Sequence, residues 1–206
     1  MTLIPVSLAV EGLLDEIVLR RLLELSGKRF AVGACYGRRG KDHLRENIGR
    51  FNHAAAHNPF VVLTDLDDEH CAPGVVGHWL PNGRHHNLVL RIAVREVESW
   101  LLADGERFAN FLGVRRERIP QWPDLTADPK DLVVELARTS RKREIREDLV
   151  PIAGSTGKVG RNYGGQLMRF AATTWLVDEM ARRRSPSLGK ALRAVQCFSP
   201  QIVGSD

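Results

Sequence analysis

Short apolar runs alternate with amphipathic stretches along the first hundred residues. The apolar runs predict strands at residues 3–10 and 29–37, within 58–70, and at 87–94. Between them, 13–25 and 41–57 carry apolar residues at helical spacing. Alternating strands and helices are typical of an open, mostly parallel sheet with helices on its faces. We therefore expect an α/β fold of the Rossmann-like kind.

The pattern changes after the fourth strand. Residues 95–114 read as helix with a break near Gly105, and three prolines between 119 and 130 require an irregular connection. Further helices are expected at about 131–139, along the amphipathic stretch 166–184 and from Pro186 onward, with a glycine-rich loop at 153–165. We expect an α/β core over 1–104 and a helical extension over 105–206 packed on the same core.

Composition narrows the class of protein. The 206 residues are 43% hydrophobic and 27% charged, which suits a folded domain, and no apolar run is long enough to span a bilayer. The N-terminus lacks signal-peptide features and the three cysteines form no disulfide or metal spacing, so we expect a cytoplasmic protein. A net charge of +5 is compatible with a polyanionic partner.

Acidic residues follow three of the four predicted strands. Glu11 ends the first, Asp65 and Asp67 end the third, and Glu98 lies four residues beyond the fourth. Ligands of open α/β sheets bind at the carboxyl ends of the strands, so these acids are expected to meet there. Clustered carboxylates repel unless a cation lies between them, and a hard ion such as Mg2+ or Mn2+ takes oxygen ligands. The spacing predicts a divalent metal site.

Each acid also has a structural explanation of its own. Glu11-Gly12 could be a turn, "DLDDEH" an Asx turn that caps a helix, and Glu98 a solvated helix position. The sixth position of that acidic stretch is His70 where a calcium loop needs glycine. The conjunction of three acidic strand ends favours the shared site.

Two segments resemble a known domain. "VEGLLDEIVL", followed about fifty residues later by "VVLTDLDD", resembles the TOPRIM domain of topoisomerases, bacterial primases, small ribonucleases and the nucleases of the OLD (overcoming lysogenization defect) family. That domain has Glu-Gly after its first strand and Asp-x-Asp after its third, which Glu11, Asp65 and Asp67 match. The resemblance implies a nuclease that needs Mg2+ or Mn2+, with nucleic acid, DNA or RNA, as its substrate.

A third segment extends the resemblance. "REVESWLLAD" is similar to a stretch in small bacterial TOPRIM-like proteins that are discussed beside phage-defence systems. It nominates Glu98 as a further metal ligand and catalytic residue, followed by Glu96 and Asp104. The usual Asp-x-Asp-x-x-Gly is absent, because the glycine is displaced to Gly74. The match is therefore to the nuclease side of the family rather than to topoisomerases.

Basic residues in two loops are candidates for phosphate binding. "GRRGKDH" presents Arg38 and Lys41 at the end of the second strand, and "AGSTGKVGR" presents Lys158 and Arg161. The latter is not a Walker motif, because Ile152 stands where the first glycine belongs. Lys158 would offset charge on the transition state. Both loops could equally be solvated surface.

Other polar and aromatic features favour structural explanations. The histidines near Cys71 match no standard zinc spacing, and Trp100 and Trp175 are expected in the core.

Three functions remain at this stage. The first is a metal-dependent nuclease, with Glu11, Glu98 and Lys158 as catalytic residues. The second is a non-catalytic, nucleic-acid-binding or regulatory subunit of a complex with an ATPase partner. The third is a phosphotransfer or nucleotide-processing enzyme. A homo-oligomer is compatible with each of them, and none requires a membrane.

Overall fold

A computed structural model of the chain describes residues 3–201, which fall into two compact units. Within the described residues, the first comprises 3–93 and 190–201, and the second comprises Val94–Gly189. No helix within the described residues is both long and apolar enough to cross a membrane.

The first unit is built on a four-stranded parallel sheet. Its strands are β1 (Ile4–Val10), β2 (Phe30–Gly37), β3 (Phe60–Asp65) and β4 (Leu88–Ala93), in the order β2-β1-β3-β4. All three pairings are parallel. The interior strands β1 and β3 are almost continuously buried, as expected for a sheet covered on both faces. The predicted α/β fold with a parallel sheet is confirmed.

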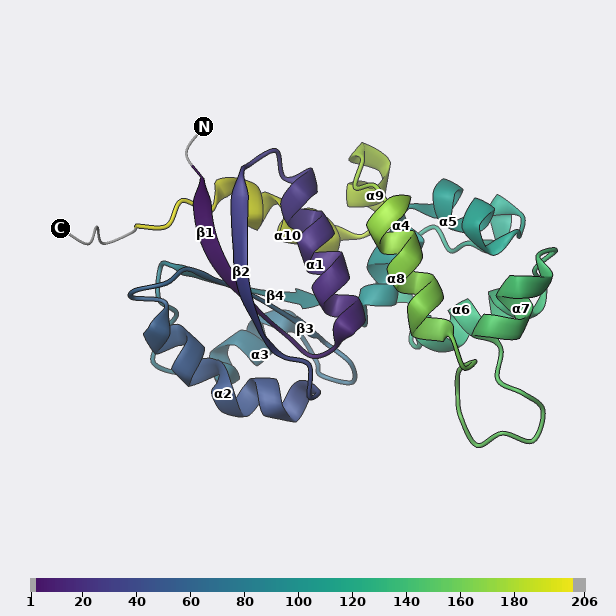
Figure 1. Cartoon of the computed structure of the whole chain (residues 1–206), viewed down its shortest axis with the longest axis horizontal. Coiled ribbons are helices and arrows are strands. Elements are labelled where there is room, and N and C mark those ends of the chain that lie inside the picture. The colour runs from purple at the N-terminus through teal and green to yellow at the C-terminus, as the bar shows by residue number, and fades with distance from the viewer. Residues whose placement is uncertain (1–2, 202–206) are drawn as a thin grey trace. The chain divides into compact units, whose positions relative to one another are not determined.

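Helices lie on both faces of this sheet. Helix α1 (Leu13–Leu25) covers one face, whereas α2 (Lys41–Ala54) and α3 (Ala72–Trp79) lie on the other (Figure 1). Helix α10 (Pro186–Cys197) starts at the proline that the sequence marked, and its residues from Lys190 onward belong to this unit. The Asn87 side chain exchanges two hydrogen bonds of 2.8 Å with the backbone of Gln201, which ties the C-terminal segment to the start of β4.

Helix α3 was not among the expected elements. It has two glycines and a proline within eight residues, a composition that scores poorly for helix. The proline lies in its first turn, where no N–H is required, and the thiol of Cys71 accepts a bond from the Gly74 amide. Capping and packing of Val75 and Trp79 thus compensate for weak propensity.

The second unit is helical. Its elements are α4 (Val97–Ala103), α5 (Gly105–Leu112), two short 3-10 turns at Arg116–Arg118 and Pro123–Leu125, α6 (Pro129–Arg138), α7 (Arg143–Leu149), α8 (Tyr163–Thr173) and α9 (Glu179–Arg184). Trp100 and Trp175 are fully buried, so their expected place in the core is confirmed. The indole of Trp175 donates to the Trp100 carbonyl (3.1 Å).

The prediction of a single helix over 166–184 is wrong. Helix α8 ends at Thr173, and the chain runs extended before Asp178 caps α9 by accepting from the Ala181 amide. The break lets Trp175 enter the core and lets the Leu176 amide donate to Asp104 (2.9 Å). These tertiary contacts outweigh the helical pattern.

The two units also divide the chain differently from the expected boundary at residue 104. Helix α4 groups with the helical unit because the Trp100 indole donates to Ser187 and its carbonyl receives Trp175. The segment from Lys190 onward groups with the sheet instead of with the helical extension.

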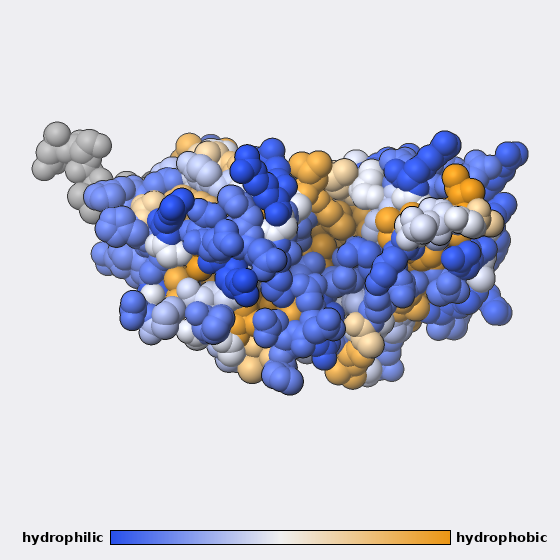
Figure 2. Space-filling model, turned by 90° about the horizontal axis from the view of Figure 1, so that it is seen from below, coloured by the Kyte–Doolittle hydropathy of each residue, from blue (hydrophilic) through white to orange (hydrophobic). Residues whose placement is uncertain are grey.

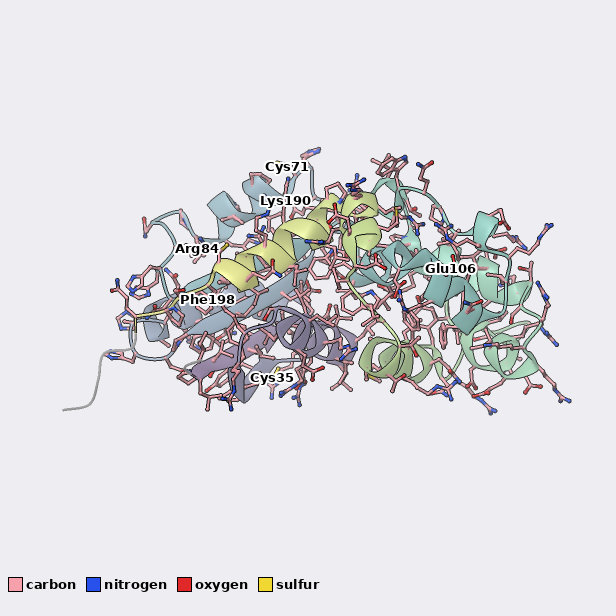
Figure 3. The ribbon with its side chains drawn as sticks, turned by 90° about the horizontal axis from the view of Figure 1, so that it is seen from above. Cys35, Cys71, Arg84, Glu106, Lys190 and Phe198 are labelled. Carbon is pink, nitrogen blue, oxygen red and sulfur yellow. The ribbon has the colours of Figure 1, made fainter. Side chains whose placement is uncertain are left out.

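The three cysteines carry free thiols. Cys35 lies on β2, Cys71 caps α3 and Cys197 ends α10, and the labelled Cys35 and Cys71 lie well apart in the first unit (Figure 3). No disulfide supports the fold within the described residues.

Candidate functional site

The site lies at the carboxyl ends of β1 and β3, which are neighbours at the centre of the sheet. From β1 the chain crosses to β2 on one side, whereas from β3 it crosses to β4 on the other. Such a reversal of direction opens a crevice where open α/β sheets bind ligands. Glu11 and Asp65 occupy the two strand ends at this point.

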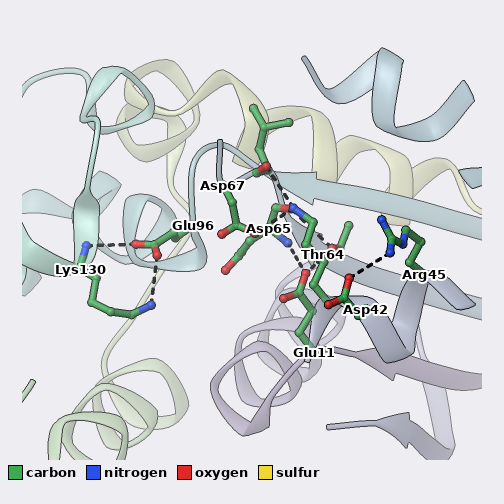
Figure 4. Close-up of polar contacts among 10 residues, drawn as sticks. Glu11, Asp42, Arg45, Thr64, Asp65, Asp67, Glu96 and Lys130 are labelled. Carbon is green, nitrogen blue, oxygen red and sulfur yellow. Dashed lines mark hydrogen bonds and ion pairs between the residues drawn. The ribbon is translucent and has the colours of Figure 1, made fainter. Parts of the chain in front are cut away.

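The Glu11 carboxylate joins the two strands. Its Oε1 accepts a hydrogen bond from the Asp65 amide (3.0 Å) and another from the hydroxyl of the buried Thr64 (Figure 4). A carboxylate offers about four acceptor positions, so these two bonds do not exhaust it. Glu11 is therefore oriented by β3 and retains capacity for a ligand.

Burial raises the pKa of Glu11 above its ordinary value of 4.5. The bonds from Thr64 and Asp65 oppose this increase, the nearby Asp67 charge adds to it, and Lys41 reduces it. A raised pKa makes this carboxylate a better proton acceptor near neutral pH than an exposed one.

Asp67 lies two residues beyond β3 beside a lysine. Lys41 Nζ donates to Asp67 Oδ2 (2.8 Å) and to the Leu66 carbonyl (3.1 Å). Asp67 has φ of 50°, a left-handed conformation that aspartate tolerates better than most residues. The structure thus brings together Glu11, Asp65, Asp67 and Lys41 of the predicted site.

The loop between β2 and α2 positions Lys41. Gly37 has φ of 90°, and a side chain there would meet the Val10 carbonyl at 2.1 Å. The Arg38 amide donates to that carbonyl (2.9 Å), and the Gly40 amide donates to the Glu11 carbonyl (3.0 Å). The loop therefore lies directly on the end of β1, which brings the first residue of α2 to the acids.

The sequence suggested that Arg38 binds phosphate, but in the structure its side chain pairs with an acid. Its guanidinium pairs with Glu16 Oε2 on α1 (2.5 Å), and Arg20 holds the other oxygen of the same carboxylate (2.9 Å). In this arrangement Arg38 neutralises a buried acid. Its role in phosphate binding stays a prediction.

A hollow opens next to the acids. We name it the acidic hollow; it measures about 290 Å3 and is lined by Lys41, Asp42, Arg45, Asp67, Asp68, Glu69 and Trp79. The Asp42 carboxylate pairs with Arg45 on its rim (3.1 Å; Figure 4). The hollow gives a ligand access to Asp67 and Lys41.

The donor chemistry of this edge suits a hard cation, since Glu11, Asp65 and Asp67 supply only oxygen atoms. Within residues 3–201, however, no three side chains of His, Cys, Asp or Glu are grouped closely enough to hold a metal ion. One oxygen of Glu11 faces β3, and one of Asp67 faces Lys41. Binding an ion would require these side chains to rotate.

Glu98 belongs to the second unit, where it is 2% exposed on α4. The Tyr163 hydroxyl donates to its Oε1 (3.1 Å), and Lys130 Nζ lies 3.9 Å from the same oxygen. Lys130 also donates to Glu96 through both its ammonium and its amide (3.1 Å each; Figure 4). Tyr163 and Lys130 could not be recognised as partners of Glu98 from the sequence, since only the fold brings α6 and α8 to α4.

This cluster shifts the pKa values of two groups upward. Burial is the main reason why the pKa of Glu98 is raised; Lys130 and Tyr163 oppose it, whereas Glu96 adds to it. Burial and the Glu98 charge also raise the pKa of Tyr163. The Tyr163 hydroxyl therefore stays protonated and donates a hydrogen bond to Glu98. The assignment of Glu98 as a metal ligand stays a prediction.

The glycine-rich loop leaves its two cations exposed. Lys158 and Arg161 are solvent-exposed, whereas Gly160 is buried, and its amide donates to the Leu149 carbonyl (2.9 Å). A side chain at Gly160 would meet the Asp148 carbonyl at 2.2 Å. The loop is thus anchored at its C-terminal end, and phosphate binding by its cations stays a prediction.

Asp104, the other acid nominated by resemblance, has structural partners. It is 4% exposed, accepts from the Leu176 amide (2.9 Å) and pairs with Arg107 (3.0 Å).

Comparison with known proteins identifies no relative of this chain. No protein-family model, no curated protein and no solved structure matches it.

Proposed function

We propose that this protein is a divalent-metal-dependent nuclease that hydrolyses phosphodiester bonds of DNA or RNA, acting in the cytoplasm. One observation carries the proposal: the Glu11 carboxylate is fixed against the backbone of Asp65 at the point where the sheet reverses direction. Acids from two separate strands reach the same edge there, beside a lysine and an open hollow. The resemblance of the acidic motifs to TOPRIM nucleases supports the same reaction class.

An Mg2+ or Mn2+ ion at this edge would be held by oxygens of Glu11, Asp65 and Asp67. When bound, such an ion polarises a phosphoryl oxygen and lowers the pKa of water. The oxygen-only donor set is what supports the ion here.

The chain's own groups have separate roles in the proposal. Glu11 is either a ligand of the ion or, where Asp65 and Asp67 hold the ion without it, the group that accepts a proton from the attacking water, a role that its raised pKa suits. Lys41 has three N–H donors, of which Asp67 and the Leu66 carbonyl take two, so one remains for a phosphate oxygen. Thr64 and the Asp65 amide keep the Glu11 carboxylate oriented.

A second candidate is a non-catalytic subunit that binds nucleic acid within an ATPase-containing complex. It is favoured by the ion pair between Lys41 and Asp67, which already neutralises the acid that a metal would need. In that case Lys41 and its neighbours would bind phosphate without cleaving it.

Incubation of the purified protein with plasmid, single-stranded DNA and tRNA, in Mg2+, Mn2+ or EDTA, separates the two. A nuclease cleaves at least one substrate in a metal-dependent way and loses this activity in Glu11→Gln and Asp65→Asn. The matched control is Glu24→Gln, an exposed acid on α1. Cleavage that survives both site substitutions contradicts the proposed site, and binding without cleavage in every metal supports the second candidate.

A further inference from the structure

A second, larger hollow lies along the same helix as the acidic hollow. It measures about 590 Å3, and its polar and aromatic lining includes Asn52, His53, Trp79, Asn82, Arg84 and His85. We name it the histidine hollow. Trp79 and residues of α2 line both hollows, so the two hollows are neighbours along α2, and we call them together the groove.

One stripe of α2 forms a wall of this groove. Residues 42, 45, 49, 52 and 53 line one or the other hollow, at the spacing of a single helical face. Gly49 lies in the middle of the stripe, and a side chain built there would meet nothing within 4 Å. The helix spans about 20 Å, so the groove leads from the acids at its N-terminus to the far hollow. Hydrophilic residues predominate on this side of the first unit (Figure 2).

The side chain of Asn52 holds the opposite wall in place. Its Nδ2 donates to the Gly83 carbonyl (3.1 Å), and its Oδ1 accepts from the His85 amide (2.8 Å). The segment 83–85 is therefore fixed to α2, and Arg84 extends from a braced backbone.

Charge differs between the two ends of the groove. The acidic hollow contains Asp42, Asp67, Asp68 and Glu69, whereas the histidine hollow contains no acid among its lining residues. Arg84 lies near the half-buried Arg91, and the like charge contributes, after burial, to lowering the pKa of Arg91. Within residues 3–201 no carboxylate pairs with either arginine. Two arginines held together without an acid favour an anionic ligand.

We propose that this groove binds a single strand of nucleic acid along α2, with a backbone phosphate at Arg84, and leads the strand to Lys41 and the acids at Asp67. The inference rests on the proposed function, since it names the form of substrate that reaches that site. Gly49 lets the strand lie close to the helix because no side chain projects there. Two hollows of about 590 and 290 Å3 that follow one another along α2 suit a single flexible sugar-phosphate chain, which can follow one face of the helix.

The test measures binding without cleavage. A fluorescent single-stranded oligonucleotide is titrated with the full chain in EDTA, and anisotropy is recorded at several salt concentrations. We expect Arg84→Ala to weaken binding about fivefold. We also expect it to reduce the slope of log affinity against log salt by about 0.7, which is the value for one lost phosphate contact on a single strand. Gly49→Glu, which places a charged side chain in the groove, weakens binding as well.

Arg50→Ala is the matched control. Arg50 is exposed on α2 one residue after Gly49, yet it lines neither hollow and contacts Asn47. It should leave both affinity and salt slope unchanged. Equal effects of Arg50→Ala and Arg84→Ala overturn the groove, as does tighter binding of a duplex of the same sequence.

The outcomes distinguish this inference from the proposed function. If the wild type cleaves in a metal-dependent way but Arg84→Ala binds as tightly as the wild type, the nuclease proposal stands and the groove is overturned. Absence of cleavage together with a reduced salt slope in Arg84→Ala retains the groove on a protein that does not cut. No binding of the oligonucleotide by the wild type overturns the groove.

Discussion

Lys41 Nζ lies 2.8 Å from Asp67 Oδ2, so an ammonium group is in contact with the carboxylate that the TOPRIM resemblance assigns to a metal. The pair is partly exposed, and the same ammonium reaches the Leu66 carbonyl. A divalent ion that binds as we propose would therefore have to compete with this lysine for Asp67.

This competition predicts opposite effects of one substitution. Lys41→Met removes the competing charge, so Mn2+ affinity measured by isothermal titration calorimetry without nucleic acid should rise about tenfold. Cleavage should nevertheless fall about 100-fold, because a phosphate-binding cation is lost. Lys190→Met, an exposed lysine on α10, is the control. Unchanged Mn2+ affinity in Lys41→Met would show that Asp67 is not a ligand.

Gly37 is predicted to be less replaceable than Gly40. Their φ values are 90° and 83°, but only at Gly37 would a side chain meet a backbone atom, the Val10 carbonyl at 2.1 Å. Gly40→Ala should lower the free energy of unfolding by about 1–3 kcal/mol through backbone strain alone, because a ψ of 175° at this positive φ is open almost only to glycine. Gly37→Ala should cost about 1–3 kcal/mol more, because β1 or the loop must move. Urea denaturation of the two variants gives the comparison, and equal costs would contradict the close contact.

Glu98 should make stability depend on pH. An acid whose pKa is raised by folding holds its proton more tightly in the folded state, so its stabilising contribution is present below the unfolded pKa, about 4.5, and is lost as pH rises through the raised value. The free energy of unfolding of the wild type minus that of Glu98→Gln should therefore decrease as pH rises from 4.5. Urea denaturation at a series of pH values measures this difference, and a flat or rising curve would rule out the raised pKa.

Tyr163→Phe extends that experiment. Loss of the hydroxyl removes a bond that favours the charged form of Glu98, so the pKa of Glu98 rises further and the loss of stability continues to higher pH. The chain has one other tyrosine, Tyr36, which is 45% exposed and serves as the matched control in Tyr36→Phe. Identical pH curves for the two variants would show that the hydroxyl does not affect Glu98.

Arg184 is predicted to stabilise the helical unit. It is 4% exposed and donates to three carbonyls, those of Ala103, Pro120 and Gln121. Lysine lacks the planar fork that reaches all three, so Arg184→Lys should cost about 2–4 kcal/mol of unfolding free energy. The same substitution at its exposed neighbour, Arg183→Lys, should change the free energy of unfolding by less than about 0.5 kcal/mol. Thermal and urea denaturation of the two variants test this prediction. If Arg184→Lys also cost less than about 0.5 kcal/mol, the three carbonyl contacts would not be stabilising the unit.

The parallel sheet and the placement of Glu11, Asp65 and Asp67 at one edge could be predicted from the sequence. Apolar runs that end in acids are local patterns, and the neighbouring positions of β1 and β3 turn them into a cluster. Pairing between elements could not be predicted in this way. Nothing near Arg38 in the sequence indicates that Glu16 on α1 takes its charge.

Two differences between the fold expected from the sequence and the observed fold have the same origin. The break between α8 and α9 depends on the burial of Trp175 against Trp100, which lies 75 residues away along the chain. Helix α3 depends on a cap and on packing rather than on its composition. Periodicity describes one element at a time, so it misses contacts that override local preference.

The bonds between Asn87 and Gln201 have a consequence for biosynthesis. They join the start of β4 to a segment that the ribosome makes only after residues 94–189. The helical unit is continuous in sequence and can fold as it emerges, whereas the bonds of Asn87 form only after the last segment has been made. Until then Asn87 lacks its two bonds to the Gln201 backbone. A chain truncated before residue 190 never forms them.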